Sequence, residues 1–340
     1  MKFRDGLEYQ GKLEAIHQIV NKIMNQESLV NQSTYMMWLD VFRGIHKEED
    51  QLLFNKNVPQ AFKTKAWAMK DVETELSSWS QLRHDTVLYV EEPYGAYLGC
   101  DYPDAYVDPR PAAWNAIRKM ANALADSLDL FHGTKTVHSK VSNKKQEGHD
   151  LHSYFEDEQK NSVAHFRNFG YIAQRLADIS EKQLRDEKQS EQDTLFLKSI
   201  VHDWKYSSGV PYGATGWYNE LFLKGIDDSK NWNPVVSDVF TVPPDPAFKD
   251  DTMKVLTEGV GNINTMYLAL DFVNGKKIMF VGPVYSHYEF YQSSRMSDSE
   301  WRQSINNYQT PPHPEWTREY LVPGINPESP GYVKDTEYQY

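Results

Sequence analysis

The stretch from residue 76 to residue 92, LSSWSQLRHDTVLYVEE, predicts one long helix that carries an arginine on its apolar face. At about 100° per residue, Leu76, Trp79 and Val87 fall on one arc of this helix. Arg83 lies within that arc. A guanidinium drawn into a core needs carboxylate or carbonyl acceptors for its five donors. We therefore expect Arg83 to be buried and a distant part of the chain to dock here.

Two pairs of residues are candidates for acid/base chemistry. His84 and Asp85 follow Arg83 and project away from the apolar arc. In YSHYEFY, an extended backbone would place His287 and Glu289 on one face. An imidazole and a carboxylate side by side can transfer protons, because each shifts the proton affinity of the other. The alternative is that Glu289 only accepts hydrogen bonds from a buried Arg83.

The composition describes a globular protein with an acidic balance. A chain of 340 residues with 40% hydrophobic residues can bury a substantial core in one large or two ordinary domains. The net charge of -12 argues against nucleic acid or an anionic membrane as the main partner. Cys100 is the only cysteine, so an intrachain disulfide and a cysteine-rich zinc site are excluded. We expect no transmembrane segment and see no signal peptide in this chain.

Helical periodicity dominates the chain up to about residue 205. Apolar residues recur at helical spacing from Val163 to Ile179, and Ser190 with Asp193 predicts a capping box that opens another helix. Beyond this point glycine, proline and β-branched residues become frequent. We predict a mainly α, α+β fold in which a helical region packs against a smaller region with a β-hairpin. The predicted limits are 1–205 for the helical region, 206–322 for the β-hairpin and short-helix region, and 323–340 for an extended tail.

The strongest local signal is TMYLALDFV-NG-KKIMFVGPVY, at residues 265–285. Asn274 and Gly275 suit a two-residue type I′ turn between two strands. This turn sets the register of the hairpin, and the paired positions form its more apolar face. The expected pairs are Phe272 with Lys277, Leu270 with Met279, and Leu268 with Val281.

Several common motifs are absent from the sequence. It contains no GxxxxGK[ST], no GxGxxG after a strand, no GxSxG and no HExxH, which removes P-loop ATPases, simple Rossmann enzymes, standard α/β-hydrolases and common zinc proteases. Asp238, in NPVVSDVFTVPPDP, lacks the ordered ligand spacing of a calcium loop, so we interpret it as part of a polar turn and as a possible acceptor for Arg83. We expect no metal site and no cofactor.

A set of segments resembles one known family. SSWSQLRHDTVLY, DAYVDPRPAAW, VSDVF, LTEGVGN, GPVYSHYEF and PPHPEW resemble, in this order, the mainly bacterial family called domain of unknown function 3160. The resemblance runs from about Met36 to Trp316 and adds Glu258, in LTEGVGN, as a candidate binding residue. It implies that the chain is the C-terminal half of the family's architecture or a shortened relative. It also implies an exported or envelope-associated location.

The chain departs from the family's pattern at two positions. Phe240 stands where we expect a histidine in the family, and His287 stands where we expect a second tyrosine. The resemblance supplies candidate positions but no reaction.

Two functions remain open. The first is a non-catalytic scaffold or binding module of an envelope or larger protein assembly, with a protein or a glycan as its partner. The second is a hydrolase-like enzyme, or a relict of one, with a polar cleft between the helical and β regions. Convergence of the candidate side chains in space favours the enzyme, and separation by more than about 12 Å favours the module. The candidates for the enzyme are Arg83, His84, Asp85, His287 and Glu289.

Overall fold

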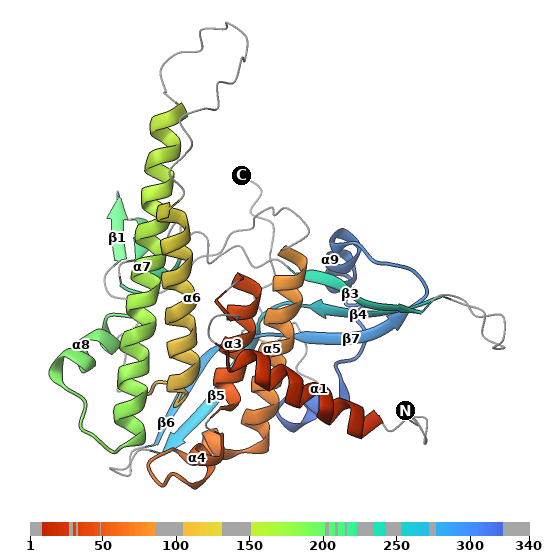
Figure 1. Cartoon of the computed structure of the whole chain (residues 1–340), viewed down its shortest axis with the longest axis horizontal. Helices are drawn as coiled ribbons and strands as arrows, with labels where there is room; N and C mark the ends of the chain where they lie inside the picture. The colour runs from red at the N-terminus through yellow and green to blue at the C-terminus, as the bar shows by residue number, and fades with distance from the viewer. Residues whose placement is uncertain are drawn as a thin grey trace, which may run out of the picture. The chain divides into compact units, whose positions relative to one another are not determined.

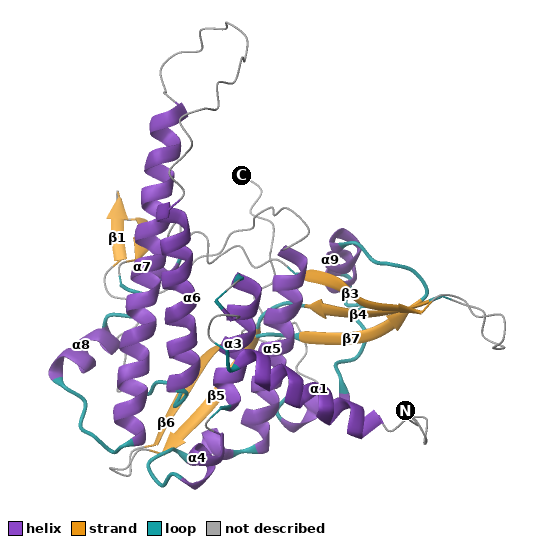
Figure 2. Cartoon of the chain, in the orientation of Figure 1, coloured by secondary structure: helices purple, strands orange, loops and turns teal. Residues whose placement is uncertain are grey.

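The chain divides into two compact units, and its fold is α+β and mainly α, as predicted. Unit 1 comprises residues 1–51 and 97–228, and unit 2 comprises residues 52–96 and 229–340. Helices predominate before residue 200 and antiparallel strands follow (Figure 2). The computed structural model describes residues 9–26, 30–31, 33–47, 49–85, 105–130, 151–200, 204–207, 210–214, 216–222, 234–242, 253–271 and 277–321.

Unit 1 is built around a pair of long helices. Helices α6 (Pro111–Leu130) and α7 (Leu151–Leu184) lie side by side (Figure 1). Helix α3 (Thr34–His46) packs against α6, and Gly44 permits the contact, because a Cβ atom there would lie 2.6 Å from the Ala113 Cα. The other elements of the unit are α1 (Tyr9–Met24), α8 (Glu191–Lys198), β1 (Trp204–Ser207), β2 (Val210–Ala214) and η2 (Asn219–Leu221). Helix α4 spans Glu49–Phe54.

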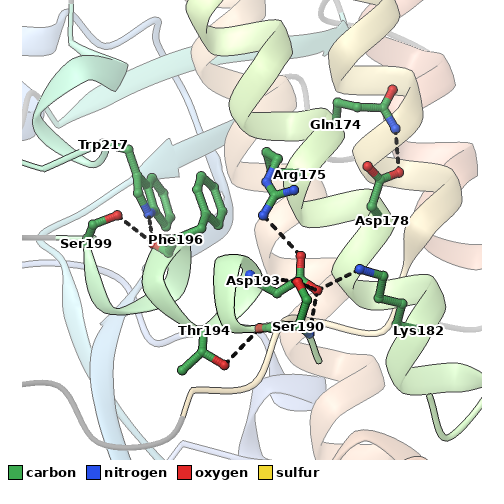
Figure 3. Close-up of polar contacts among 10 residues, drawn as sticks. All are labelled: Gln174, Arg175, Asp178, Lys182, Ser190, Asp193, Thr194, Phe196, Ser199 and Trp217. Carbon is green, nitrogen blue, oxygen red and sulfur yellow. Dashed lines mark hydrogen bonds and ion pairs between the residues drawn. The ribbon is translucent and has the colours of Figure 1, made fainter. Parts of the chain in front are cut away.

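A buried carboxylate joins α8 to α7 (Figure 3). Ser190 and Asp193 form the predicted capping box at the start of α8. Oδ1 of Asp193 lies 3.0 Å from Nη2 of Arg175, and Oδ2 lies 2.6 Å from Nζ of Lys182. Burial would raise the pKa of Asp193, but hydrogen bonds from Lys182 and Ser190 outweigh it and lower the pKa to about 2. The cluster therefore fixes the position of α8 electrostatically.

Unit 2 has a helix on each face of a small sheet. Strands β3 (Val235–Val242), β4 (Lys254–Val260) and β7 (His287–Gln292) are antiparallel in the order β3-β4-β7. Helix α5 (Lys65–Asp85) packs against all three strands (Figure 1). Helix α9 (Asp298–Asn306) begins after its N-cap residue Ser297 and lies on the other face. The short helices are η1 (Gln60–Lys63) and η4 (Glu315–Glu319).

Trp301 of α9 is the centre of the apolar core on that second face. Its indole is fully buried and packs against Val236, Tyr288 and Phe290. Gly259 of β4 allows this approach, because a Cβ atom at that position would lie 2.7 Å from Cζ2 of Trp301. Since side chains alternate along a strand, the residues between these apolar ones point to the face that α5 covers.

Strands β5 (Asn264–Asp271) and β6 (Lys277–Val284) form the predicted hairpin with a different register. Leu270 opposes Ile278, and Asp271 opposes Lys277. The predicted pairing of Leu270 with Met279 is therefore wrong by one residue, and the other two predicted pairs are wrong in the same way. The Asn274-Gly275 turn lies outside the described residues.

The apolar pattern of β6 explains this error. Ile278 and Phe280 alternate with Met279 and Val281, so either face of the strand could have been the buried one. In the structure, Met279 and Val281 are 61% and 62% exposed, whereas Leu270 of β5 is buried. A shift of one residue exchanges the two faces of a strand, and here it exchanges two apolar sets.

The structure describes only the first part of the long helix predicted over residues 76–92. Helix α5 is described to Asp85, and the remainder of residues 76–92 lies outside the described residues, as does the predicted tail 323–340. Among the described residues, no helix is long and apolar enough to cross a membrane.

Candidate functional site

The face of α5 that meets the sheet is polar. Glu73, Ser77 and Ser80 follow one another at spacings of four and three residues, and all three are fully buried. Leu76 and Trp79, which belong to the predicted apolar arc, are only half-buried. In the part of α5 whose burial is described, the buried face is therefore the polar one and not the start of the predicted apolar arc. Strands of unit 2 pack on this helix, and whether they meet Arg83 as expected stays a prediction.

Two hydrogen bonds join this helix face to the sheet. The backbone N–H of His287 donates to Oε1 of Glu73 at 3.0 Å, and the Ser80 hydroxyl donates to Oε2 of Glu258 at 3.0 Å. The Tyr320 hydroxyl donates to Oε2 of Glu73. Burial raises the pKa of Glu73, although the hydrogen bonds from Tyr320 and His287 oppose the rise. One helix thus positions residues of two neighbouring strands.

Strand pairing places two carboxylates and an imidazole on one face of the sheet. Glu258 of β4 stands directly opposite Glu289 of β7, and His287 precedes Glu289 by two residues on the same strand. One nitrogen or oxygen atom from each of the three side chains lies within 4.8 Å of the other two. We call Glu258, His287 and Glu289 the His287 cluster. The shared face of His287 and Glu289 is as predicted, and Glu258 is the residue that pairing adds.

The imidazole of His287 is fully buried, and neither ring nitrogen has a hydrogen-bond partner among the residues that the structure describes. Burial lowers the pKa of His287 to about 4, and the neighbouring His313 acts in the same direction. The ring is therefore neutral at neutral pH, with a lone pair on one nitrogen. Burying such a group without a partner costs free energy that a bound ligand would offset.

A segment after α9 covers the backbone of β7. Nδ1 of His313 lies 2.9 Å from the carbonyl oxygen of His287, and the His313 ring stacks on Tyr288 with 4.2 Å between the centroids. The Trp316 ring lies 6.3 Å from the His287 ring. Burial lowers the pKa of His313, although its contact with the His287 carbonyl opposes the shift. These contacts hold the strand residue that carries the unpartnered imidazole.

The other candidate residues do not join the His287 cluster in the described part of the chain. Arg83, His84 and Asp85 are the last residues of α5, and their side chains lie outside the described part, so the burial of Arg83 stays a prediction. Asp238 lies within strand β3 and not in the polar turn that we inferred, and it pairs with Thr257 on the face opposite to the cluster. Its Oδ2 lies 3.3 Å from Nε of Arg295. Asp238 is therefore not part of this site.

Three of the residues around the cluster were not predicted from the sequence. Glu73, Ser77 and Ser80 recur at helical spacing, and this periodicity is visible in the sequence. It was missed because the buried face of a helix was sought among apolar residues. Phe240, at the first departure from the family's pattern, pairs with Leu256 and is 60% exposed.

Fold and site together define an α+β protein with a buried carboxylate and imidazole cluster between a helix and an antiparallel sheet. The chain belongs to the family described as Protein of unknown function (DUF3160), which matches residues 2–317. This match covers nearly the whole chain, so the expectation that the chain is the C-terminal half of the family's architecture is wrong. No curated protein and no solved structure matches the chain.

Proposed function

We propose that the chain acts as a binding module and that the His287 cluster is its ligand site. The observation that carries this proposal is the fully buried imidazole of His287, which has no partner among the described residues and lies beside two carboxylates. A folded protein rarely leaves such a group unsatisfied, and a ligand, an ion or a bound water is the usual explanation. The protein or glycan partner that we expect from the sequence stays a separate proposal for the module and is not assigned to the His287 cluster.

Binding is favoured over catalysis because of how the imidazole is buried. A side chain with no exposed surface cannot meet a large substrate, but it can contact a small ligand that becomes part of the interior. The carboxylate of Glu289, in contrast, belongs to an exposed residue and offers contact with solvent. The cluster therefore has one buried end and one accessible end.

A hydrolase-like enzyme is the second candidate. The proximity of His287 and Glu289 favours it, because an imidazole and a carboxylate within 4.8 Å can share acid/base work. The enzyme would also require Arg83, His84 and Asp85 to reach the cluster from the end of α5. Substitution of His84 or Asp85 should abolish turnover if this second function holds, and binding alone should be insensitive to both.

The experiment compares ligand binding by the parent protein, Glu289→Gln and Glu315→Gln. The amide keeps the shape of the side chain while removing its charge, and Glu315 is an exposed glutamate of the same unit. Thermal shift is measured with manganese, zinc, calcium, citrate and N-acetylglucosamine as separate probes. We expect at least one probe to stabilise the parent and Glu315→Gln but not Glu289→Gln. The proposal fails if no probe stabilises the parent, or if Glu289→Gln responds as the parent does.

A further inference from the structure

We propose that Glu258, His287 and Glu289 bind a divalent transition-metal ion. The inference rests on the proposed function and names the chemical class of its ligand. The three ligand atoms lie within 4.8 Å of one another. Two ligand atoms on opposite sides of an ion at about 2.1 Å are about 4.2 Å apart. Small side-chain rotations are therefore enough to bring all three atoms onto one ion.

A cation would both offset the repulsion between the two carboxylates and give the imidazole nitrogen a partner. Glu258 and Glu289 are directly opposed on neighbouring strands, and like charges in this arrangement repel each other. Between them and His287, a cation would attract both carboxylates and would accept the lone pair of the neutral imidazole. An anionic ligand would relieve neither problem.

The residues around the cluster are suited to orient metal ligands. Ser80 donates a hydrogen bond to Glu258, and Glu73 accepts the backbone N–H of His287. The Ser80 contact fixes the orientation of the Glu258 carboxylate, and such outer contacts raise metal affinity, whereas the Glu73 contact fixes the backbone that carries the imidazole. Both come from the rigid helix α5, and the proposed ligands are on strands. A site on regular elements is more precisely held than one on loops.

The ligand types select the class of metal. Imidazole suits zinc, iron, copper and nickel, and carboxylate suits manganese and the alkaline-earth ions, whereas calcium prefers oxygen ligands throughout. One imidazole with two carboxylates therefore favours zinc, iron or manganese over calcium or magnesium. Three protein ligands also leave at least one coordination position for water or a second ligand.

An arginine of the chain could supply positive charge in place of a metal. Arg83 follows Ser80 by three residues on α5, and its place on the predicted apolar arc implies that it needs a carboxylate acceptor. A guanidinium cannot coordinate the lone pair of His287 as a metal ion does. One of its N–H groups could instead donate a hydrogen bond to that nitrogen. A metal ion and Arg83 as occupants of the cluster predict different results for metal binding, and the variant Arg83→Met distinguishes them.

The test measures manganese and zinc binding by calorimetry after dialysis against a chelator. We expect one equivalent to bind the parent, Glu315→Gln and His165→Gln, which changes a histidine of α7. Affinity should fall at least about tenfold in Glu258→Gln, His287→Gln and Glu289→Gln. Calcium should bind more weakly than either probe. If His287→Gln does not fold, Glu289→Gln still tests the inference, because Glu289 is exposed and its substitution should leave the fold intact.

Three outcomes would overturn the inference. If neither metal binds the parent at one equivalent but citrate or N-acetylglucosamine requires Glu289, the site binds another ligand and only the metal is excluded. If metals bind without loss in Glu289→Gln, they bind elsewhere and the proposed function fails as well. If the parent binds no metal and Arg83→Met gains a site, the arginine occupies the cluster.

Discussion

The backbone N–H of His287 donates to the carboxylate of Glu73, 214 positions earlier in the chain. Glu73 is fully buried in helix α5, and His287 opens strand β7. A single carboxylate therefore sets where the strand begins relative to the helix. Because the imidazole of His287 extends from the same residue, this contact also positions the centre of the candidate site.

Replacing Glu73 by glutamine should destabilise unit 2 by about 1–3 kcal/mol. The carboxylate accepts from both His287 and Tyr320, whereas the amide can accept at only one atom and presents its NH₂ group to a donor at the other. Urea unfolding of the variant and the parent measures the difference. Glu315→Gln removes the same charge at an exposed position and should change little. Equal stability of the two variants would contradict the role given to Glu73.

Gly259→Ala should destabilise the protein by about 1–3 kcal/mol, because the added methyl group would overlap the buried Trp301 indole. Gly282→Ala is the matched control, since a Cβ atom there meets nothing within 4 Å. Thermal unfolding of both variants, followed by tryptophan fluorescence, measures the effect. A Gly259→Ala protein as stable as the Gly282→Ala protein would show that the indole is not held against β4.

The register of the β5–β6 hairpin predicts opposite results for two substitutions. Leu270→Ala should cost about 2–5 kcal/mol because Leu270 is buried. Met279→Ala should cost less than about 0.5 kcal/mol because Met279 is exposed. Chemical denaturation of both variants checks this. Large and similar losses would favour the register in which these two residues share the buried face.

The Asp193 carboxylate should stabilise unit 1 except at strongly acidic pH, where it becomes protonated. Its pKa is about 2 in the folded chain against a usual value of 3.8, so its contribution is fully present above about pH 4 and is lost as the pH falls towards 2. The contribution is on the order of 2 kcal/mol before solvent screening of Arg175 and Lys182, which are partly exposed. The free energy of unfolding of the parent and Asp193→Asn, measured from pH 7 to pH 2.5, gives the comparison.

The parent should therefore be more stable than Asp193→Asn at pH 7 and at pH 4.5, with a difference that shrinks below pH 4. A constant difference down to pH 2.5 would mean that the carboxylate charge does not hold α8 on α7. Glu315→Gln, as an exposed carboxylate control, should show no such trend.

Features set by neighbouring residues were predictable from the sequence. The capping box of Ser190 and Asp193 depends on residues three apart, and the common face of His287 and Glu289 follows from strand alternation. Glu258 could not be placed beside them in this way, because its position depends on the pairing of β4 with β7. The register of the hairpin failed for a related reason, since both faces of β6 are apolar.

The polar face of α5 could not be predicted as buried, for a different reason. Hydrophobic periodicity identifies a buried helix face only when that face is apolar. Glu73 and Ser80 are buried because partners on distant strands and at Tyr320 accept or donate their hydrogen bonds. Such partners exist only in the folded unit, so the sequence of the helix alone could not assign this face to the interior.

The way the β5–β6 hairpin is inserted has a consequence for the order of folding. Its two strands lie between β4 and β7 in the chain. At the base of this inserted segment, the backbone N–H of Gly261 donates to the Ser286 carbonyl at 2.8 Å. Pairing β4 with β7 first would close a long flexible loop, whereas a formed hairpin shortens the loop that remains to be closed. The hairpin should therefore assemble before the central pairing, and the His287 cluster, which depends on that pairing, should be among the last parts of unit 2 to form.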